Sequence, residues 1–495
     1  MFNLVVSNSI KKNKRVAYRA VIIVVLTVLG IGWGQAECST QNDVIKGMRI
    51  EDVRVVNDDC IHLSTTGAIF KINKSSGTME IYQRIGKKRK LAEVSLSDKF
   101  ISVLKKEPHN EGFEYAWGDK DKTASIVISG DSVVRFYNVK KIKIELFFTP
   151  IHHKINSLNR GLIALDNEGG FAIMPPDKIT STDYSVTIEK KEWLLDSDSN
   201  MSVLFLGVCP PREFDWERSK WPVIHYSSHI QRYPSDEQIK EYSKFAKVLE
   251  MHQWVWKNRY VNKKDCSKEP YNNCDGDNTP LWRDDASWPV NNRWIADDEK
   301  ELKRVVTTAH ANGMLVAVYF NGLKMDCHSI LPEALRLKNK YNIDGIYLDG
   351  LLNCSNRGPL DAYLTARELR KLFGDDGWIN YHNTHKGYFS PFIQTYMDFV
   401  TTGEHNKFDR YTSTTFNISN AIGGYWPEIP FFWLNDSKNI KDARSYLKDL
   451  VDISLKYHNR LLFLTGEQGQ WRFWRLYFTP SEMQFMKDYY LNRIS

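Results

Sequence analysis

The sequence lacks the short motifs that identify several large classes of enzyme. It contains no phosphate-binding loop, no glycine fingerprint for dinucleotides, no helical zinc-binding His motif and no Gly-x-Ser-x-Gly elbow. It also contains no internal repeat and no low-complexity tract. The stretch from Cys274 to Asp277 resembles part of a calcium loop but lacks the later glutamate. We therefore expect neither a cofactor nor a metal ion.

Net charge is scarce outside the first 36 residues. The formal charge of the chain is +7. The first 36 residues contain no acidic residue and five basic ones, which are Lys11, Lys12, Lys14, Arg15 and Arg19. Without them the charge falls to about +2, which is too little for a nucleic-acid-binding protein. We expect no nucleic-acid partner, and the sequence identifies no protein partner.

The longest apolar run is also short. It extends from Ala20 to Trp33, whereas a membrane-spanning helix needs roughly 20 residues. The run follows the basic residues and precedes the small residues Gly34 and Ala36. This order predicts a signal peptide over residues 1–36, hence a secreted or extracytoplasmic protein. A retained membrane anchor is the alternative.

Seven cysteines are present, and an exported chain with this number is expected to form disulfides. Their positions permit the following pairs: Cys60 with Cys209, Cys266 with Cys274, and Cys327 with Cys354. Cys38 is then left over. The sequence alone leaves the connectivity open.

Residues 37–215 have the pattern of an all-β domain. Short runs such as Ala68–Ile72, Ser125–Ser129 and Val133–Tyr137 are apolar or alternate, and Gly, Asn and Asp turns separate them. No long helical period intervenes. We predict an antiparallel β-sandwich.

The pattern changes after the proline-stiffened segment Cys209–Trp216, and in residues 216–495 helices alternate with apolar strands. The expected strands are 253–256, 315–320, 346–348, 378–382, 399–402, 429–434 and 461–465, with residues 421–425 as a candidate eighth. Helices of 10–20 residues between strands imply parallel βα units, and about 270 residues fit one (β/α)8 TIM-like barrel. An open doubly wound sheet is the alternative.

Polar side chains follow the expected strands at the point where each one ends. They are Lys257, Asn321, Asp349, His382, Glu404, Asn435 and Glu467. In a barrel the carboxyl ends of the strands meet at one mouth, where active sites lie. Packing alone would be served equally well by apolar residues, so this set predicts a functional site.

Two carboxylates in this set have the arrangement that glycoside hydrolysis requires. Asp349 precedes Gly350 and Glu404 follows Gly403, each at the end of an apolar strand. One carboxylate attacks the anomeric carbon while the other protonates the departing oxygen. We predict Asp349 as nucleophile and Glu404 as acid/base, with Glu428 as the rival acid. The alternatives are that Asp349 only caps a turn and that Glu404 is a buried structural group.

Further side chains are candidates for binding a sugar. Polar candidates for its hydroxyl groups are Asn321, His382, His385 and His405, although a single His is often structural. Aromatic candidates for stacking on its rings are Trp256, Trp282, Trp288 and Trp426. We expect about half of these tryptophans to belong to the core instead.

The stretch from Ile343 to Asp349 resembles the strand-four nucleophile motif of retaining glycoside hydrolases with an N-terminal β-sandwich and a TIM barrel. In layout the chain is similar to the α-galactosidase and α-glucosidase superfamily and to α-N-acetylgalactosaminidase-type enzymes. The resemblance implies Asp349 as nucleophile, and Glu404 matches the acid/base by position only. Two departures leave the exact family open: Tyr347 stands where α-galactosidases carry Lys, and the Trp-x-Asp-Met motif of α-glucosidases is absent.

The sequence thus predicts a secreted glycosidase that cleaves O-glycosidic bonds of an oligo- or polysaccharide with retention of configuration. A non-catalytic carbohydrate-binding protein on the same scaffold and a barrel polysaccharide lyase are the alternatives.

Overall fold

The computed structural model describes residues 48–96, 108–174, 185–213, 218, 221–257, 292–350, 359–382, 393–401, 427–428, 443–456, 462–465 and 480–494, with short gaps inside several of these ranges. The predicted signal peptide lies outside them, as do several predicted site residues named below. Among the described residues, no helix is long and apolar enough to cross a membrane.

The first half of the described chain consists of two eight-stranded sheets in which every strand pairing is antiparallel. The first sheet has the order β1 (Ile50–Asn57), β2 (Cys60–Thr65), β3 (Ala68–Asn73), β4 (Thr78–Gln83), β5 (Arg89–Leu96), β10 (Val139–Leu146), β15 (Glu192–Met201) and β14 (Ser185–Glu189). The second has the order β11 (His152–Ile155), β12 (Leu162–Asp166), β13 (Gly169–Met174), β16 (Leu204–Cys209), β9 (Val133–Tyr137), β8 (Lys122–Ser129), β7 (Gly112–Asp119) and β6 (Pro108–His109).

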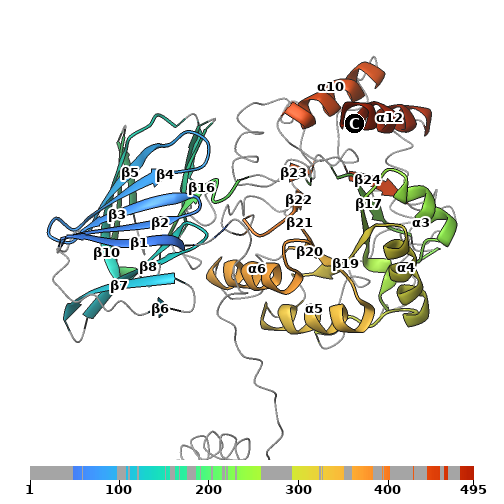
Figure 1. The fold of residues 1–495 in the computed structure, drawn as a ribbon, viewed down its shortest axis with the longest axis horizontal. Helices are drawn as coiled ribbons and strands as arrows, with labels where there is room; N and C mark the ends of the chain where they lie inside the picture. Colours follow the sequence, from blue (N-terminus) through green and yellow to red (C-terminus); the bar gives the residue numbers. More distant parts are fainter. Residues whose placement is uncertain are drawn as a thin grey trace, which may run out of the picture. The chain divides into compact units, whose positions relative to one another are not determined.

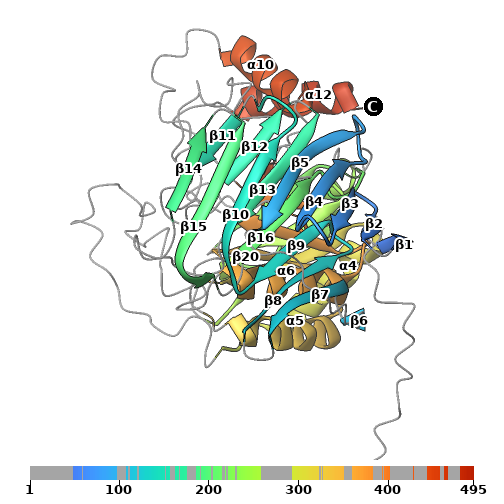
Figure 2. The ribbon, with the colours of Figure 1, turned by 90° about the vertical axis from the view of Figure 1, so that its left-hand side faces the viewer.

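These sheets face each other, as Figures 1 and 2 show, and they share one core. Buried and half-buried residues alternate along β3, which matches the sequence pattern that predicted it. Phe70 and Ile81 of one sheet and Val134 and Leu206 of the other are all fully buried in that core. The predicted antiparallel β-sandwich is therefore present.

The second half contains a sheet in which every pairing is parallel. Its order is β23 (Pro427–Glu428), β22 (Phe399–Thr401), β21 (Trp378–His382), β20 (Gly345–Asp349), β19 (Leu315–Asn321), β18 (Val248–Met251), β17 (Val223–Tyr226) and β24 (Leu462–Thr465). The described helices are α3 (Asp236–Ser243), α4 (Glu299–Ala311), α5 (Cys327–Tyr341), α6 (Pro359–Phe373), α10 (Ala443–Lys456) and α12 (Pro480–Ile494).

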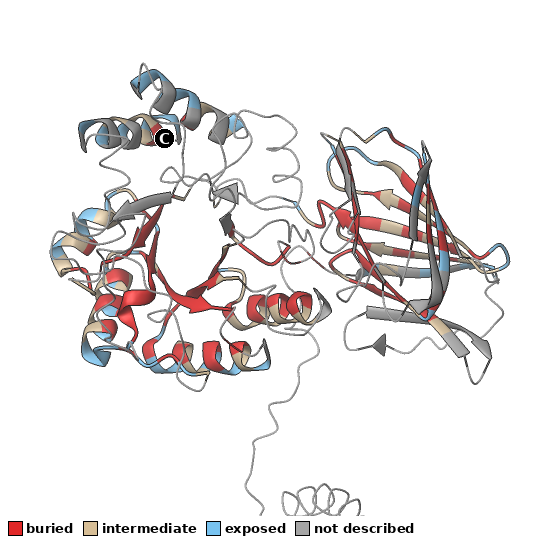
Figure 3. Cartoon of the chain, turned by 180° about the vertical axis from the view of Figure 1, so that it is seen from behind, coloured by how far each residue is buried: buried red, intermediate tan, exposed pale blue. Residues whose placement is uncertain are grey.

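The strands of this sheet follow an arc around a shared interior (Figure 3). Seven strands are neighbours in chain order, and the last strand, β24, lies beside the first, β17. This is the order of a barrel rather than of a doubly wound sheet. A pairing of β23 with β24, which would complete a ring, is not found among the described residues.

One predicted strand is wrong. Residues Gln253–Val255 form a 3₁₀ turn, and the strand is β18, five positions earlier. Helix α3 ends at Ser243, although Leu249 continues the apolar period that begins with Ile239. A buried strand is apolar on both faces, so its sequence is hard to separate from the apolar face of a helix.

The structure adds a strand that the sequence reading omitted. β17 pairs with both β18 and β24 and thus joins the start of this half to its end. It has only four residues, and all of them are buried. Counted from β17, Asp349 ends the fourth strand. The predicted strands at 421–425 and 429–434 fall outside the described residues.

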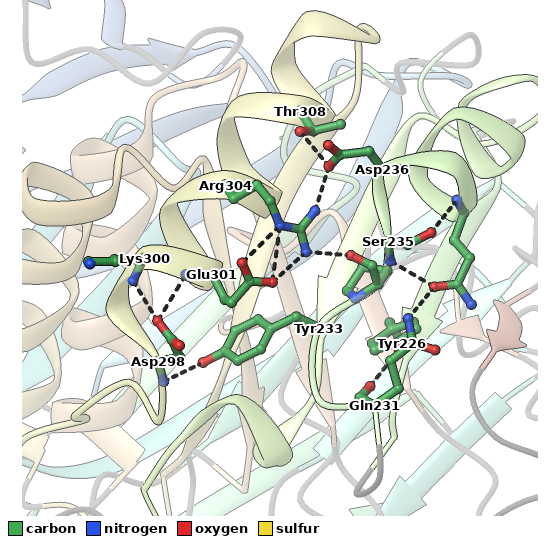
Figure 4. Close-up of polar contacts among 12 residues, drawn as sticks. Tyr226, Gln231, Tyr233, Ser235, Asp236, Asp298, Lys300, Glu301, Arg304 and Thr308 are labelled. Carbon is green, nitrogen blue, oxygen red and sulfur yellow. Dashed lines mark hydrogen bonds and ion pairs between the residues drawn. The ribbon is translucent and has the colours of Figure 1, made fainter.

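Helices α3 and α4 are joined by a polar cluster that Figure 4 shows. Arg304 donates to Glu301 and to the carbonyl of Pro234, and it forms an ion pair with Asp236. A capping box closes the first turn of α3: Ser235 Oγ accepts from the main-chain N–H of Gln238 at 3.2 Å, and Gln238 Oε1 accepts from the main-chain N–H of Ser235 at 2.7 Å.

The predicted Cys60–Cys209 disulfide is wrong, because both thiols are free. Cys209 is fully buried, and burial raises the pKa of its thiol to about 12. Of the other predicted pairs, Cys266, Cys274 and Cys354 lie outside the described residues.

Candidate functional site

The interior of the parallel sheet has an apolar floor and a polar upper part. The floor is a cluster with one residue from each of five strands: Val223, Val248, Ala317, Trp378 and Phe399. All five are completely buried, and four of them begin their strands. The polar residues described next lie on or directly after β17 to β21, further toward the carboxyl ends of these strands.

Asp349 ends β20 and its side chain is 21% exposed. The next residue, Gly350, has a φ of 78°, which a residue with a side chain rarely adopts. The Gly350 amide donates to the carbonyl of His382 at 3.1 Å. Gly350 thus has a backbone conformation that favours glycine, and the carboxylate of Asp349 is held in a network of side chains.

Two side chains from neighbouring strands contact the Asp349 carboxylate. The Tyr319 hydroxyl on β19 donates to Oδ2 at 2.8 Å. Nδ1 of His382 on β21 lies 3.3 Å from Oδ1. Asn321, Asp349 and His382 are register partners across the three strands. The structure thus brings together three of the predicted site residues.

Aromatic rings fill the space beneath this carboxylate. Tyr347 stacks on the His382 ring with centroids 5.7 Å apart, and its hydroxyl lies 2.7 Å from His382 Nδ1. Tyr347 also contacts the rings of Tyr319 and His252, with centroids 5.6 and 5.8 Å apart. His252 lies 4.7 Å, ring centre to ring centre, from His225. These residues form one contiguous layer.

A completely buried carboxylate, Glu250, lies in the same interior. Its Oε1 accepts from Trp378 Nε1 at 2.7 Å and from Asn380 Nδ2 at 2.9 Å. Its Oε2 lies 3.2 Å from His225 Nδ1. Glu250 is completely buried and accepts from Trp378 and Asn380, so it has the contacts of a structural anchor of this interior.

His252 is 4% exposed and follows β18 directly. Burial lowers the pKa of His252 well below its ordinary value, and the charges of His225 and His382 lower it further. The ring is therefore neutral at pH 7. Ser227 Oγ lies 3.5 Å from its Nδ1, at the limit of a hydrogen bond.

Sequence reasoning missed His225, Glu250, His252, Tyr319 and Tyr347. Three of them interrupt or follow short buried strands that the sequence reading omitted or misplaced. The usable signal was a single ionisable residue inside an apolar run, as Glu250 is in Val248–Met251. With β18 in its observed place, His252 takes the position that had been given to Lys257.

Trp256 is corrected from a stacking platform to a core residue. Its side chain is 1% exposed, and its indole N–H donates to the carbonyl of Tyr319 at 2.9 Å. Its ring packs against Trp294 with centroids 5.6 Å apart. A ring that is almost completely buried cannot stack on a sugar.

The main chain of Glu428 continues the series of register partners that includes Asp349 and His382. His382 pairs with Thr401, and Thr401 pairs with Glu428 on β23. The other predicted site residues lie outside the described residues. They are Glu404, His385, His405, Trp282, Trp288 and Trp426. Within the described ranges no group of His, Cys, Asp and Glu is arranged to hold a metal ion.

The sequence matches no protein-family model and no curated protein. Solved structures with some similarity include a sulfoquinovosidase from E. rectale (TM-score 0.40, 9% identity, 89% of this chain and 82% of that chain). A maltogenic alpha-amylase from Thermotoga neapolitana (TM-score 0.36, 9% identity) covers 56% of this chain and 77% of its own. A chitinase from Pseudoalteromonas aurantia (TM-score 0.34, 10% identity) covers 56% and 100%. All three are glycoside hydrolases, but at these scores the likeness carries no argument about this chain.

Proposed function

We propose that the chain is a glycoside hydrolase that cleaves O-glycosidic bonds of an oligo- or polysaccharide, with Asp349 as the nucleophile. The observation that carries the proposal is the placement of this half-buried carboxylate at the carboxyl end of the fourth parallel strand, with Tyr319 on one oxygen and His382 beside the other. Carboxyl strand ends are where barrel enzymes perform chemistry. The proposal includes closure of the parallel sheet into a (β/α)8 barrel and secretion through residues 1–36.

The surroundings of Asp349 suit a nucleophile. The Tyr319 hydroxyl stabilises the carboxylate form, because it donates to a charged acceptor. A retaining glycosidase uses such a carboxylate to form a glycosyl–enzyme ester, while a second acid protonates the leaving oxygen. We assign that second role to Glu404, with Glu428 as the rival. No cofactor takes part in this mechanism.

The test compares Asp349→Asn with Glu299→Gln on a panel of aryl α- and β-glycosides. Glu299 is an exposed carboxylate on α4 that pairs with Lys340, so its loss controls for removal of a charge. We expect kcat of Asp349→Asn to fall roughly a thousandfold or more, because the covalent route is lost. Glu299→Gln should retain full activity. Azide should restore turnover to Asp349→Ala by forming a glycosyl azide.

Glu404 and Glu428 are distinguished by the leaving group of the substrate. The variant that lacks the acid should still cleave dinitrophenyl glycosides, whose leaving group needs no proton, and should fail with alkyl glycosides. The alanine variant of the other carboxylate should show no such split.

Three results would contradict the proposal. The first is hydrolysis that Asp349→Asn retains. The second is sugar binding without any turnover, which would indicate a binding protein. The third is release of an unsaturated product that absorbs in the ultraviolet, which would indicate a lyase.

A further inference from the structure

The hydroxyl group of Tyr347 makes a contact in the site that packing of its ring does not require. It lies in the middle of β20 and is 4% exposed. Its hydroxyl reaches His382 Nδ1 at 2.7 Å, which is shorter than the 3.3 Å from that nitrogen to Asp349 Oδ1. A phenylalanine would fill the same space without this contact, so the hydroxyl group needs its own explanation.

Two oxygen atoms, the Tyr347 hydroxyl and Asp349 Oδ1, compete for Nδ1 of His382. A neutral imidazole carries a proton on one nitrogen and a lone pair on the other. If Nδ1 accepts the Tyr347 proton, it has no proton to donate to Asp349, and the imidazole N–H is on Nε2. If Nδ1 carries a proton, it is drawn toward the Asp349 carboxylate. Nδ1 lies closer to the Tyr347 hydroxyl than to the Asp349 carboxylate, and a phenol that donates to this nitrogen produces the first state.

The groups that face His382 have opposite effects on the protonation of its Nδ1. Asp349 on β20 attracts a proton to Nδ1. Tyr347 on β20 opposes this when it donates to Nδ1, whereas the His252 ring, which follows β18, is neutral at pH 7 and adds no charge. The balance matters because an imidazolium at Nδ1 would pair with Asp349 and reduce the nucleophilicity of its carboxylate.

We propose that Tyr347 is a positioning residue that holds His382 as the neutral Nε2–H tautomer and thereby prevents an imidazolium from forming beside the Asp349 carboxylate. The role of Asp349 rests on the proposed function, but the state of His382 does not. The proton involved moves only between Nδ1 of His382 and solvent, and no bond to the substrate changes in this step.

The direct test is ¹⁵N NMR of histidine-labelled full-length protein as a function of pH. The His382 signals are assigned by their loss in His382→Gln. We expect wild type to show the neutral Nε2–H tautomer at pH 7. In Tyr347→Phe the titration midpoint of His382 should rise, and its signals at pH 7 should move toward those of imidazolium.

Tyr226→Phe is the matched control. Its hydroxyl donates to the carbonyl of Gln231 at 2.6 Å, in the same sheet but away from His382. This variant should leave the His382 titration unchanged. Identical His382 signals in wild type and Tyr347→Phe would overturn the proposal. If Tyr347→Phe does not fold, the wild-type spectrum decides, because a proton on Nδ1 at pH 7 is by itself contrary to the proposal.

Kinetics give the second readout. We expect the acid limb of kcat/KM to move to higher pH in Tyr347→Phe, so that kcat/KM in that limb falls about tenfold for each pH unit of displacement. Near the optimum KM should change little. A uniform loss at every pH would mean a packing role only and would overturn the proposal. Absence of any glycoside hydrolysis would refute the proposed function while leaving the NMR result intact.

Discussion

His252 is a neutral imidazole in a buried interior, and its low pKa makes the stability of the protein depend on pH. Burial lowers its pKa, with help from His225 and His382. In the unfolded chain the same ring takes up a proton below about pH 6.5. The unfolded state then binds more protons than the native state, so acid favours unfolding.

We predict that the free energy of unfolding falls as pH drops below 6.5, with His252 contributing about 1.4 kcal/mol per pH unit. Urea unfolding at pH 7.5, 6.5 and 5.5 measures the slope. His252→Gln should flatten it, whereas His328→Gln, which removes an exposed ring, should not. An unchanged slope in His252→Gln would show that this ring is not the source of the acid sensitivity.

Single residues also differ in whether a short window of sequence is enough to predict their role. Asp349 and His382 were found because each ends an apolar strand, a property that a window of a few residues contains. Trp256 was misassigned because an aromatic residue beside a polar loop looks the same whether its ring is buried or exposed. Its 1% exposure depends on Trp294 and Tyr319, which are distant in the chain.

Among the elements, α3 depends on its first turn because it has only eight residues. Its capping box satisfies two main-chain N–H groups that the helix itself cannot satisfy. We predict that Ser235→Ala lowers the free energy of unfolding by about 1 kcal/mol. Chemical denaturation followed by circular dichroism measures the loss.

Ser243→Ala provides the control, because Ser243 is at the other end of α3 and its hydroxyl only donates to the carbonyl of Lys240. It should change stability by less than about 0.5 kcal/mol. Equal effects of the two substitutions would mean that the capping contacts contribute nothing specific.

The longer strands of the parallel sheet were predicted within a residue, as β19 and β21 show. The two shortest early strands of the parallel sheet were not. β17 and β18 have four residues each and are buried throughout, so they lack the alternation that marks a strand with one face in water. Only their pairing with β24 and β19 identifies them.

For the molecule as a whole, the sandwich and the parallel sheet are connected through a buried carboxylate. Asp131 precedes β9, is 5% exposed, and accepts hydrogen bonds from Tyr363 of α6 at 2.6 Å and from Tyr396. Burial raises the pKa of Tyr363, and the negative charge of Asp131 raises it further. Phe205 of β16 packs on the Tyr363 ring with centroids 5.5 Å apart.

We predict that Asp131→Ala destabilises the protein by about 2 kcal/mol or more, because two buried hydroxyl groups lose their acceptor. Differential scanning calorimetry should also show two separate transitions where wild type shows one. Asp59→Ala removes an exposed carboxylate of the sandwich and should do neither. A single transition at the wild-type temperature in Asp131→Ala would contradict this coupling.

The amino-acid sequence by itself determined the two kinds of sheet, most of the helices and the carboxylate that ends the fourth strand, because alternation, helical period and capping act within a few residues. Only the tertiary structure decided that His225, Glu250, His252 and Tyr347 share one interior. Glu250 and Asn380 bond across 130 positions of the chain. Which side chains face inward depends on strand register, and a slip of one residue would turn each of them to the opposite face.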